Sequence, residues 1–280
     1  MSKTRSISRR DLLKGAVPAA AALALGVPGV GLPEPAAAAT TTFKKRRYAM
    51  LIDLRKCIGC ESCTIACKAE NNIGVDSSWM RSRRITWNQV LQEEAPRGVP
   101  AFEYIPQPCN HCDDPMCIKV CPTGATYKDE DRGVVLQIYD RCIGCRLCTQ
   151  ACPYTRRYFN WEAPSFPHVT RMDAKDFSTQ KGGFDPLVPV RPKGVVEKCT
   201  FCVQRIQAAE AKAQAENRDL RDGDITPACV STCLGQARVF GDLNDPKSQI
   251  VQLIQQYGDR VFRLQEHLGT QPKVFYIPET

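Results

Sequence analysis

The sequence predicts an α+β fold made of two small units, in which short strands lead into cysteine-rich loops and short helices follow them. Sixteen cysteines in 280 residues are far more than packing requires, and they fall into four groups of four. Strand-like runs precede the first and third groups. Apolar residues make up 43% of the chain and charged residues 24%, as in an ordinary folded protein, which excludes a disordered chain.

The first 39 residues resemble an export signal rather than part of the fold. Arg9 and Arg10 form a twin-arginine pair, the stretch 15–33 carries no charge, and small residues at 36–39 offer a cleavage site. We predict a Tat signal peptide over residues 1–39 and a periplasmic protein at the outer face of the cytoplasmic membrane. A basic leader without structure and an uncleaved membrane anchor remain open as alternatives.

Charge and hydropathy exclude two classes of protein. The net charge of +8 includes the basic leader and is too small to indicate a nucleic-acid-binding surface. After residue 40, no apolar run approaches the ~18 residues that a membrane-spanning helix needs. The sequence also has no nucleotide-binding glycine motif, no nucleophile–base arrangement and only 3 histidines. We expect no nucleic-acid partner and no direct small-molecule substrate.

The first strand, predicted over residues 47–54, leads into the first cysteine group, and residues 134–140 lead in the same way into the third. Both groups have the spacing C-x2-C-x2-C-x3-C. In bacterial ferredoxins this run wraps three thiolates around one [4Fe–4S] cluster, while the fourth cysteine reaches a second cluster. Gly59 and Gly144 supply the small residue that each tight loop needs at its bend. The four groups are Cys57, Cys60, Cys63 and Cys67; Cys109, Cys112, Cys117 and Cys121; Cys142, Cys145, Cys148 and Cys152; and Cys199, Cys202, Cys229 and Cys233.

Two other uses of cysteine fit this spacing poorly. A disulfide framework suits short secreted chains, and triplets spaced by two would place their sulfurs on one loop without distant partners. Structural zinc favours C-x2-C pairs separated by a dozen or more residues, which only the fourth group resembles. We predict four [4Fe–4S] clusters, with a structural zinc or disulfide protein as the alternative.

In this arrangement, the fourth cysteine of each group binds the cluster of its partner group, so partner groups should lie close together. Since only 20 residues separate Cys121 from Cys142, the second and third groups should form one inner unit over residues 105–160. The first and fourth groups then form an outer unit, residues 46–70 plus 195–240. The predicted ligand sets are Cys109, Cys112, Cys117 and Cys152; Cys142, Cys145, Cys148 and Cys121; Cys57, Cys60, Cys63 and Cys233; and Cys199, Cys202, Cys229 and Cys67.

Several other side chains stand close to the predicted ligands. His111, between two cysteines, is expected to be a hydrogen-bonding neighbour rather than an iron ligand. Four basic residues could offset cluster charge or lie in solvent: Lys56, Arg141, Arg146 and Lys198.

The scaffold outside the ligand loops is expected to include a helix over residues 203–224. The C-terminal extension, residues 241–280, should hold a helix with Pro246 at its first position. One apolar face of that helix would carry Ile250, Leu253, Ile254 and Tyr257. A last strand is predicted over residues 273–277.

Five motifs spread over residues 46–280 carry a family resemblance: R-Y-A-M-L-I-D-L-R-K-C-I-G-C-E-S-C, C-N-H-C-D-D-P-M-C, C-P-T-G-A-T, C-T-F-C-V-Q-R-I and A-R-V-F-G-D-L-N-D-P-K-S. On these, the chain resembles the four-cluster ferredoxin-like beta subunits of complex iron–sulfur molybdoenzymes, and among them most the beta subunit of tetrathionate reductase. The longer stretch between Cys202 and Cys229 departs from that pattern.

The resemblance implies two ferredoxin-like dicluster units and an electron relay. Electrons would pass through four clusters between a multi-spanning, quinone-reactive membrane anchor subunit and a molybdopterin catalytic subunit of a periplasmic tetrathionate or polysulfide reductase-like enzyme. The cluster of the first group would face the catalytic subunit, and that of the third group the anchor. The equivalent subunit of a membrane hydrogenase, of alternative complex III or of a sulfite-related transmembrane complex is the alternative within this class.

Overall fold

The computed structural model describes residues 44–74, 84–92, 104–164 and 185–279. They belong to one unit that runs from Lys44 to Thr280. The predicted Tat signal peptide, with Arg9 and Arg10, lies outside the described residues. No helix in the described ranges has the length and apolar character needed to cross a bilayer.

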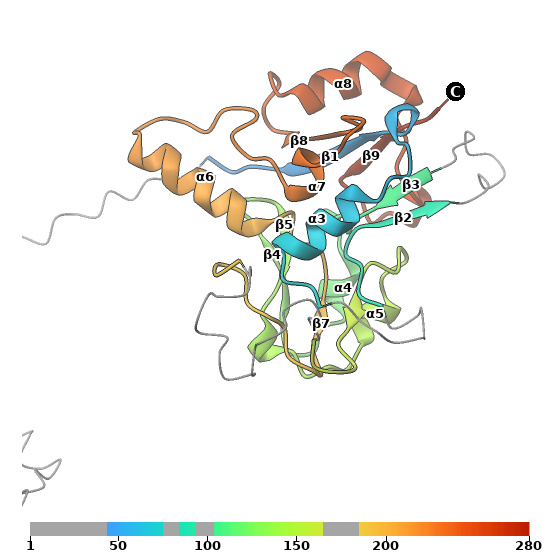
Figure 1. Cartoon of the computed structure of the whole chain (residues 1–280), viewed down its shortest axis with the longest axis vertical. Coiled ribbons are helices and arrows are strands. Elements are labelled where there is room, and N and C mark those ends of the chain that lie inside the picture. The colour runs from blue at the N-terminus through green and yellow to red at the C-terminus, as the bar shows by residue number, and fades with distance from the viewer. Residues whose placement is uncertain (1–43, 75–83, 93–103, 165–184, 280) are drawn as a thin grey trace, which may run out of the picture. The chain divides into compact units, whose positions relative to one another are not determined.

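A three-stranded sheet forms the centre of this unit (Figure 1). Its middle strand is β1 (Tyr48–Asp53), which pairs antiparallel with β8 (Arg238–Asp242) and parallel with β9 (Val274–Ile277). Segments almost 200 residues apart in the sequence therefore meet in one sheet. The strands predicted over residues 47–54 and 273–277 are confirmed.

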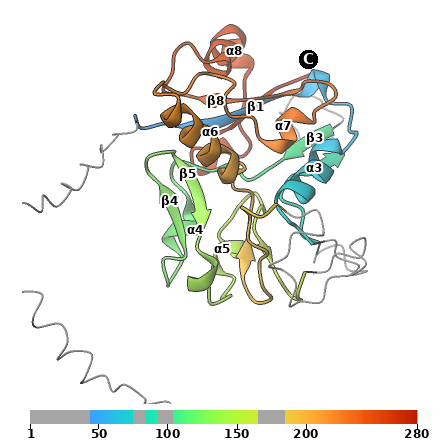
Figure 2. The same ribbon diagram turned by 60° about the vertical axis from the view of Figure 1, so that its left-hand side comes forward.

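The two faces of β1 pack into different cores, because successive side chains of a strand point to opposite sides. Ala49 and Leu51 pack with Ile250 on the inner face of α8 (Gln249–Tyr257), which covers this side of the sheet in Figures 1 and 2. The predicted apolar face of α8 is confirmed, since its other three members pack there too. Met50 and Ile52 point into the larger core, which contains four of the cysteines, with Cys109 packed against it.

Short helices and hairpins on the cysteine-rich side of the sheet carry the ligand loops (Figure 2). The α-helices there are α3 (Ser62–Glu70), α4 (Met116–Lys119), α5 (Leu147–Gln150), α6 (Val203–Ala215) and α7 (Ala228–Ser231). Three antiparallel strand pairs join β2 (Gln89–Gln92) to β3 (Tyr104–Gln107), β4 (Thr126–Asp129) to β5 (Val134–Gln137), and β6 (Tyr158–Phe159) to β7 (Val196–Glu197). Single 3-10 turns are η1 (Leu54–Lys56), η3 (Tyr139–Arg141), η5 (Gly258–Arg260) and η6 (Glu266–Leu268).

Two predicted element ends are wrong. The strand before the third group ends at Gln137, because η3 completes the lead-in to the cysteines. The helix predicted over residues 203–224 ends at Ala215, and Asn217 then takes a left-handed conformation with φ 49° that breaks the helical path.

The prediction for Pro246 also fails. The α8 helix begins at Gln249 with Ser248 as its N-cap, so Pro246 precedes it in a turn. The turn is stabilised by Asp245, whose carboxylate accepts a hydrogen bond from the Lys247 backbone at 2.9 Å. Because the backbone carbonyl of Asp245 binds the Ser248 N–H at 3.0 Å, the backbone closes one turn ahead of the helix.

Candidate metal centres

The first and third cysteine groups adopt the same local structure. In each, a 3-10 turn ends at the first cysteine, and a glycine with positive φ bends the backbone ahead of the second: Gly59 at 67° and Gly144 at 69°. A left-handed residue then starts a helix, α3 after Glu61 and α5 after Arg146. The repeated sequence C-I-G-C thus produces a repeated loop, with the later cysteines on or beside the helix.

Neither glycine leaves room for a side chain. A Cβ on Gly144 would lie 2.2 Å from the carbonyl oxygen of Gly194, and one on Gly59 would lie 2.5 Å from the ring of Tyr104. A positive φ also disfavours other residues. The expected role of a small residue at each bend is therefore visible in the structure.

The sixteen cysteines are all free thiols, and they differ in exposure. Cys60 and Cys145 are exposed, whereas the other fourteen are buried or half-buried. Both exposed cysteines take the second position of a C-I-G-C loop. No cysteine of the second or fourth group is exposed.

Electrostatic coupling shows which thiols lie close together. Burial raises the pKa of Cys67 well above its usual value, and Cys199, Cys202 and Cys229 raise it further. These four thiols form one of the predicted sets, which the fold assembles from α3, the segment before α6, and α7.

Two more sets show the same coupling in whole or in part. Burial raises the pKa of Cys112 to about 12, with contributions from Cys109, Cys117 and Cys152. For Cys57, burial raises the pKa first, and Cys63 and Cys233 add to the rise. Burial raises the pKa of Cys148, and Cys117, of a different predicted set, adds more to the rise than Cys142 of its own set. The cluster to which each sulfur binds stays a prediction.

Many cysteine sulfurs accept hydrogen bonds from N–H groups, as ligating thiolates do. Backbone N–H groups donate to Cys233 at 3.2 Å, to Cys142 and Cys199 at 3.4 Å, and to Cys121 at 3.5 Å. Burial alone would raise the pKa of Cys121. Hydrogen bonds from Thr126, Thr123 and Ala125, with Thr126 the strongest, instead lower it to about 7. At Cys121, the hydrogen bonds therefore favour the charged form of the sulfur.

Several positively charged side chains are buried near the cysteines, and they bear on whether negatively charged clusters fit there. Arg156, Arg157, Lys198 and Arg238 are each at most 6% exposed, and in the described ranges none forms an ion pair with a carboxylate. An unpaired buried charge is strongly destabilising. Negatively charged clusters held by the neighbouring thiolates supply the missing countercharge, so the residues present fit [4Fe–4S] clusters.

His111 connects two cysteine groups in the middle of this region. It is fully buried, its Nδ1 accepts a hydrogen bond from the Val135 backbone at 3.0 Å, and its ring stacks on Phe201 with centroids 3.8 Å apart. Burial, with Lys198 and Lys273, holds the pKa of His111 well below its usual value, so the ring is neutral. Its hydrogen bond goes to backbone rather than to a cysteine sulfur.

The four basic residues predicted beside ligands divide into two kinds. Lys198 is buried, and its ammonium donates to the carbonyls of Val135 and Cys199. Lys56, Arg141 and Arg146 are exposed. Lys56 forms an ion pair with Asp53 at 3.9 Å, and Arg146 lies over the rings of Phe159 and Trp161. The sequence prediction missed Arg157 and Arg238, although both stand five positions after a predicted ligand, Cys152 and Cys233.

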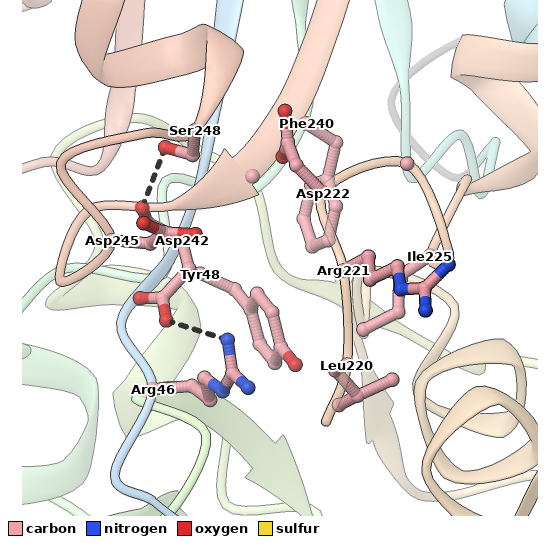
Figure 3. Close-up of a pocket in the computed structure, with 12 residues that line it drawn as sticks. Arg46, Tyr48, Leu220, Arg221, Asp222, Ile225, Phe240, Asp242, Asp245 and Ser248 are labelled. Carbon is pink, nitrogen blue, oxygen red and sulfur yellow. Dashed lines mark hydrogen bonds and ion pairs between the residues drawn. The ribbon is translucent and has the colours of Figure 1, made fainter. Parts of the chain in front are cut away.

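A small pocket lies away from the cysteines, between the ends of β1 and β8 and the turn that follows α6 (Figure 3). Arg46 and Asp242 form an ion pair on one wall, and Leu220 and Ile225 line the other. Its volume is about 20 Å³, which is room for about one water molecule. Its twelve lining residues include no cysteine. Among the described residues, no cluster of His, Cys, Asp and Glu has the close geometry of a single-ion site either.

Comparisons with known proteins identify the kind of centre. Two family models, both described as 4Fe-4S dicluster domains, match residues 100–172 and 56–125. Together they cover the first three cysteine groups. The fourth group, at residues 199–233, lies outside both matched ranges.

Curated relatives match nearly the whole chain. The iron–sulfur cluster-binding subunit of a menaquinone reductase from Nitratidesulfovibrio vulgaris is 43% identical over 85% of this chain and 91% of its own length. A tetrathionate reductase subunit from Salmonella typhimurium is 37% identical over 83% of this chain and 73% of its own length. A polysulfide reductase polypeptide from Wolinella succinogenes is 34% identical over 83% of this chain and 95% of its own length.

These matches, with the sixteen cysteines, show a chain that binds four [4Fe–4S] clusters and transfers electrons. The predicted α+β fold with two dicluster units is confirmed. The alternative of a structural zinc or disulfide protein is wrong.

Proposed function

We infer the partners and the electron path of this chain from the family to which it belongs, the ferredoxin-like iron–sulfur subunits of complex iron–sulfur molybdoenzymes. We propose that it carries single electrons between a multi-spanning, quinone-reactive membrane anchor subunit and a molybdopterin catalytic subunit. The relative named as a menaquinone reductase subunit supports the quinone end of this path, and those named for tetrathionate and polysulfide reductases support the catalytic end.

The exposure of Cys60 and Cys145 carries this proposal. Electron tunnelling falls steeply with distance, so a relay can exchange electrons with a partner only where a cluster approaches the surface. The two exposed cysteines belong to different predicted ligand sets, those of the first and the third group. A relay with one entrance and one exit needs this arrangement.

Exposed apolar side chains stand close in sequence to cysteines of the first-group and third-group ligand sets. Ile58, Ile65 and Leu234 are 64%, 68% and 72% exposed near the first-group set, and Ile143 and Leu147 are 67% and 50% exposed near the third-group set. Large exposed apolar side chains that cluster at one place favour a protein interface. We propose that the Cys60 end contacts the catalytic subunit and the Cys145 end the anchor, as the family resemblance implies.

The proposal includes the ligand sets, the units and the location predicted from the sequence. The clusters would be bound by Cys57, Cys60, Cys63 and Cys233; by Cys67, Cys199, Cys202 and Cys229; by Cys109, Cys112, Cys117 and Cys152; and by Cys121, Cys142, Cys145 and Cys148. The inner unit, residues 105–160, holds the last two. The outer unit, residues 46–70 and 195–240, holds the first two.

Ligand variants at the two ends test the direction of the path. In the purified complex, Cys145→Ser should remove or convert the end cluster nearest the anchor, so that a quinol no longer reduces the remaining clusters while a reductant acting through the catalytic subunit still does. Cys60→Ser should give the reverse result. Stopped-flow absorbance and EPR measure both. Equal reduction from both sides in each variant would contradict the proposed ends.

A separate experiment tests location. We propose export by the Tat system, which carries proteins already folded around their cofactors, into the periplasm. The double variant Arg9→Lys/Arg10→Lys should leave the chain in the cytoplasm with its clusters assembled, as cell fractionation and iron analysis would show. Normal export of this variant would overturn the Tat assignment and leave the relay function standing.

The terminal substrate is proposed only as a class. We propose a tetrathionate or polysulfide reductase-like enzyme, in which the substrate site lies on the catalytic subunit and not on this chain. Purification of the intact complex and mass spectrometry of its largest subunit test this assignment. A largest subunit of the hydrogenase type would contradict it.

A further inference from the structure

Two buried arginines occupy equivalent places in the two halves of the cysteine pattern. Arg157 stands five positions after Cys152, and Arg238 stands five positions after Cys233. In the proposed ligand sets, Cys152 and Cys233 are the two cysteines that complete a triplet lying earlier in the chain. The same C-x4-R spacing therefore occurs once in the inner unit and once in the outer unit.

Each arginine donates a hydrogen bond to the triplet that its own cysteine completes. The Nη2 of Arg157 lies 3.1 Å from the sulfur of Cys117, and the Nη2 of Arg238 lies 3.4 Å from the sulfur of Cys63. Cys117 and Cys63 are both the third cysteine of their triplets. The two arginines therefore match both in their spacing from a cysteine and in the cysteine sulfur that they bind.

Apart from cysteine sulfurs, the groups that the two guanidinium groups contact are neutral. Arg157 donates to the Thr126 hydroxyl and the Gln137 side-chain oxygen, both at 3.1 Å. Arg238 donates to the Asn88 side-chain oxygen at 2.8 Å and lies 3.4 Å from the Met50 sulfur.

Because both arginine side chains are buried, their positive charges need a nearby negative partner. Arg157 and Arg238 are 6% and 4% exposed, and neither has a carboxylate partner in the described part of the chain. Water is nearly excluded, so the ligating sulfurs are the countercharge that the structure provides.

The same two charges also reach the neighbouring cluster of each unit. Arg157 also forms a side-chain hydrogen bond with Cys148, and Arg238 forms one with Cys229. Cys148 and Cys229 are the third cysteines of the other two triplets. Each arginine therefore contacts cysteines of both ligand sets proposed for one unit.

We propose that Arg157 and Arg238 are positioning residues that raise the reduction potentials of the two clusters in the inner and the outer unit, respectively, and reduce the repulsion between electrons on adjacent clusters. Reduction adds negative charge to a cluster, and hydrogen bonds and charge at its sulfurs are among the factors that set its potential. A fixed cation between two clusters stabilises an electron on either one. This inference rests on the ligand sets proposed above.

Two matched variants, Arg157→Gln and Arg238→Gln, test the proposal in the full-length chain purified anaerobically within its complex. EPR-monitored redox titration gives the potentials, and iron analysis counts the clusters. Each variant should lower both potentials of its own unit, so that the reduced-to-oxidised ratio at a fixed potential falls at least tenfold, or 59 mV for a one-electron couple. The other unit should change less than twofold and serves as the internal control.

The lysine variants Arg157→Lys and Arg238→Lys separate charge from shape. Lysine keeps the cation without the planar fork, so it should retain all clusters and restore at least part of the lost potential. If a glutamine variant loses clusters while its lysine counterpart keeps them, the need for a positive charge is supported. Loss of clusters in both would show a purely structural role and overturn the proposal.

Two further results would count against the inference. Unchanged potentials, or equal shifts in all four clusters, in glutamine variants with full iron content would overturn it while leaving the relay function intact. A wild-type chain without iron would instead overturn the relay itself.

Discussion

The two C-I-G-C groups and the other two cysteine groups have the same number of sulfurs but opposite surroundings. In the first and third groups, the second cysteine is exposed and exposed isoleucines stand beside it. In the second and fourth groups, the space between ligand loops is filled by the stacked rings of His111 and Phe201. We therefore expect the clusters of the first and third groups to be open to partners and those of the second and fourth groups to be enclosed.

The enclosed region also joins the two dicluster units. Among the influences that raise the pKa of the buried thiol of Cys199, burial comes first and Cys109 second, so sulfurs of different units lie close together there. His111 and Phe201 are both buried at this junction, and no cysteine of the second or fourth group is exposed. We therefore propose a relay with two open ends and an insulated centre.

The largest effect is expected from Gly144→Ala in the third-group loop. Its Cβ would lie 2.2 Å from a backbone oxygen that cannot move aside, and φ of 69° adds about 1–2 kcal/mol of strain. We expect loss of this loop's cluster, seen as one missing EPR signal and four fewer irons per chain. Full cluster content in this variant would contradict the loop geometry.

Gly59→Ala provides the matched comparison between the two open loops. The new Cβ would meet the ring of Tyr104, which is a side chain and can turn. We expect the first-group cluster to persist, with the chain destabilised by about 1–2 kcal/mol from φ alone. Denaturant unfolding under anaerobic conditions measures this. A cluster loss equal to that of Gly144→Ala would show that the two loops are equally rigid.

A smaller effect is expected at the insulated centre. His111→Leu leaves the buried N–H of Val135 without its acceptor, which costs about 1–3 kcal/mol. The exposed His267 provides the control, since His267→Leu should change the free energy of unfolding by less than ~0.5 kcal/mol. Similar losses in both variants would contradict the role given to the His111 contact.

The smallest effect on folding is expected from the exposed isoleucines. Ile58→Ser should weaken binding of the catalytic subunit, and Ile143→Ser binding of the anchor, with unfolding free energies changed by less than ~0.5 kcal/mol. Leu187, 70% exposed and outside the cysteine groups, gives the control Leu187→Ser. Pull-down of each partner subunit with tagged chain measures the result. Loss of both partners in either variant would erase the distinction between the ends.

The sequence predicted the ligand loops and central strands because their signals are local. The C-x2-C-x2-C-x3-C spacing and the short apolar runs of the strands act over a few positions, and both appear where expected. Arg157 and Arg238 were missed because each binds a sulfur far away in sequence: Cys117 is 40 positions away from Arg157 and Cys63 is 175 from Arg238. Only the repeated C-x4-R spacing could have indicated them.

The wrong boundaries have a similar cause. Side-chain composition favoured a helix to residue 224, but Arg218 binds Asp224 and Glu216, and these ion pairs stabilise a turn instead. Exposure could not be predicted from composition either. Cys60 and Cys63 stand three positions apart, but Cys60 lies in the loop and is exposed, whereas Cys63 lies on α3 and is buried.

The contrast between open ends and insulated centre can be measured directly on the full-length chain. A soluble dysprosium chelate speeds the magnetic relaxation of any reduced cluster that it approaches, so EPR power saturation reports how close each cluster lies to solvent. The account predicts strong relaxation enhancement for two of the four clusters, with one of the two responses lost in Cys60→Ser and the other in Cys145→Ser. Uniform enhancement of all four clusters, or a response that survives in both variants, would contradict it.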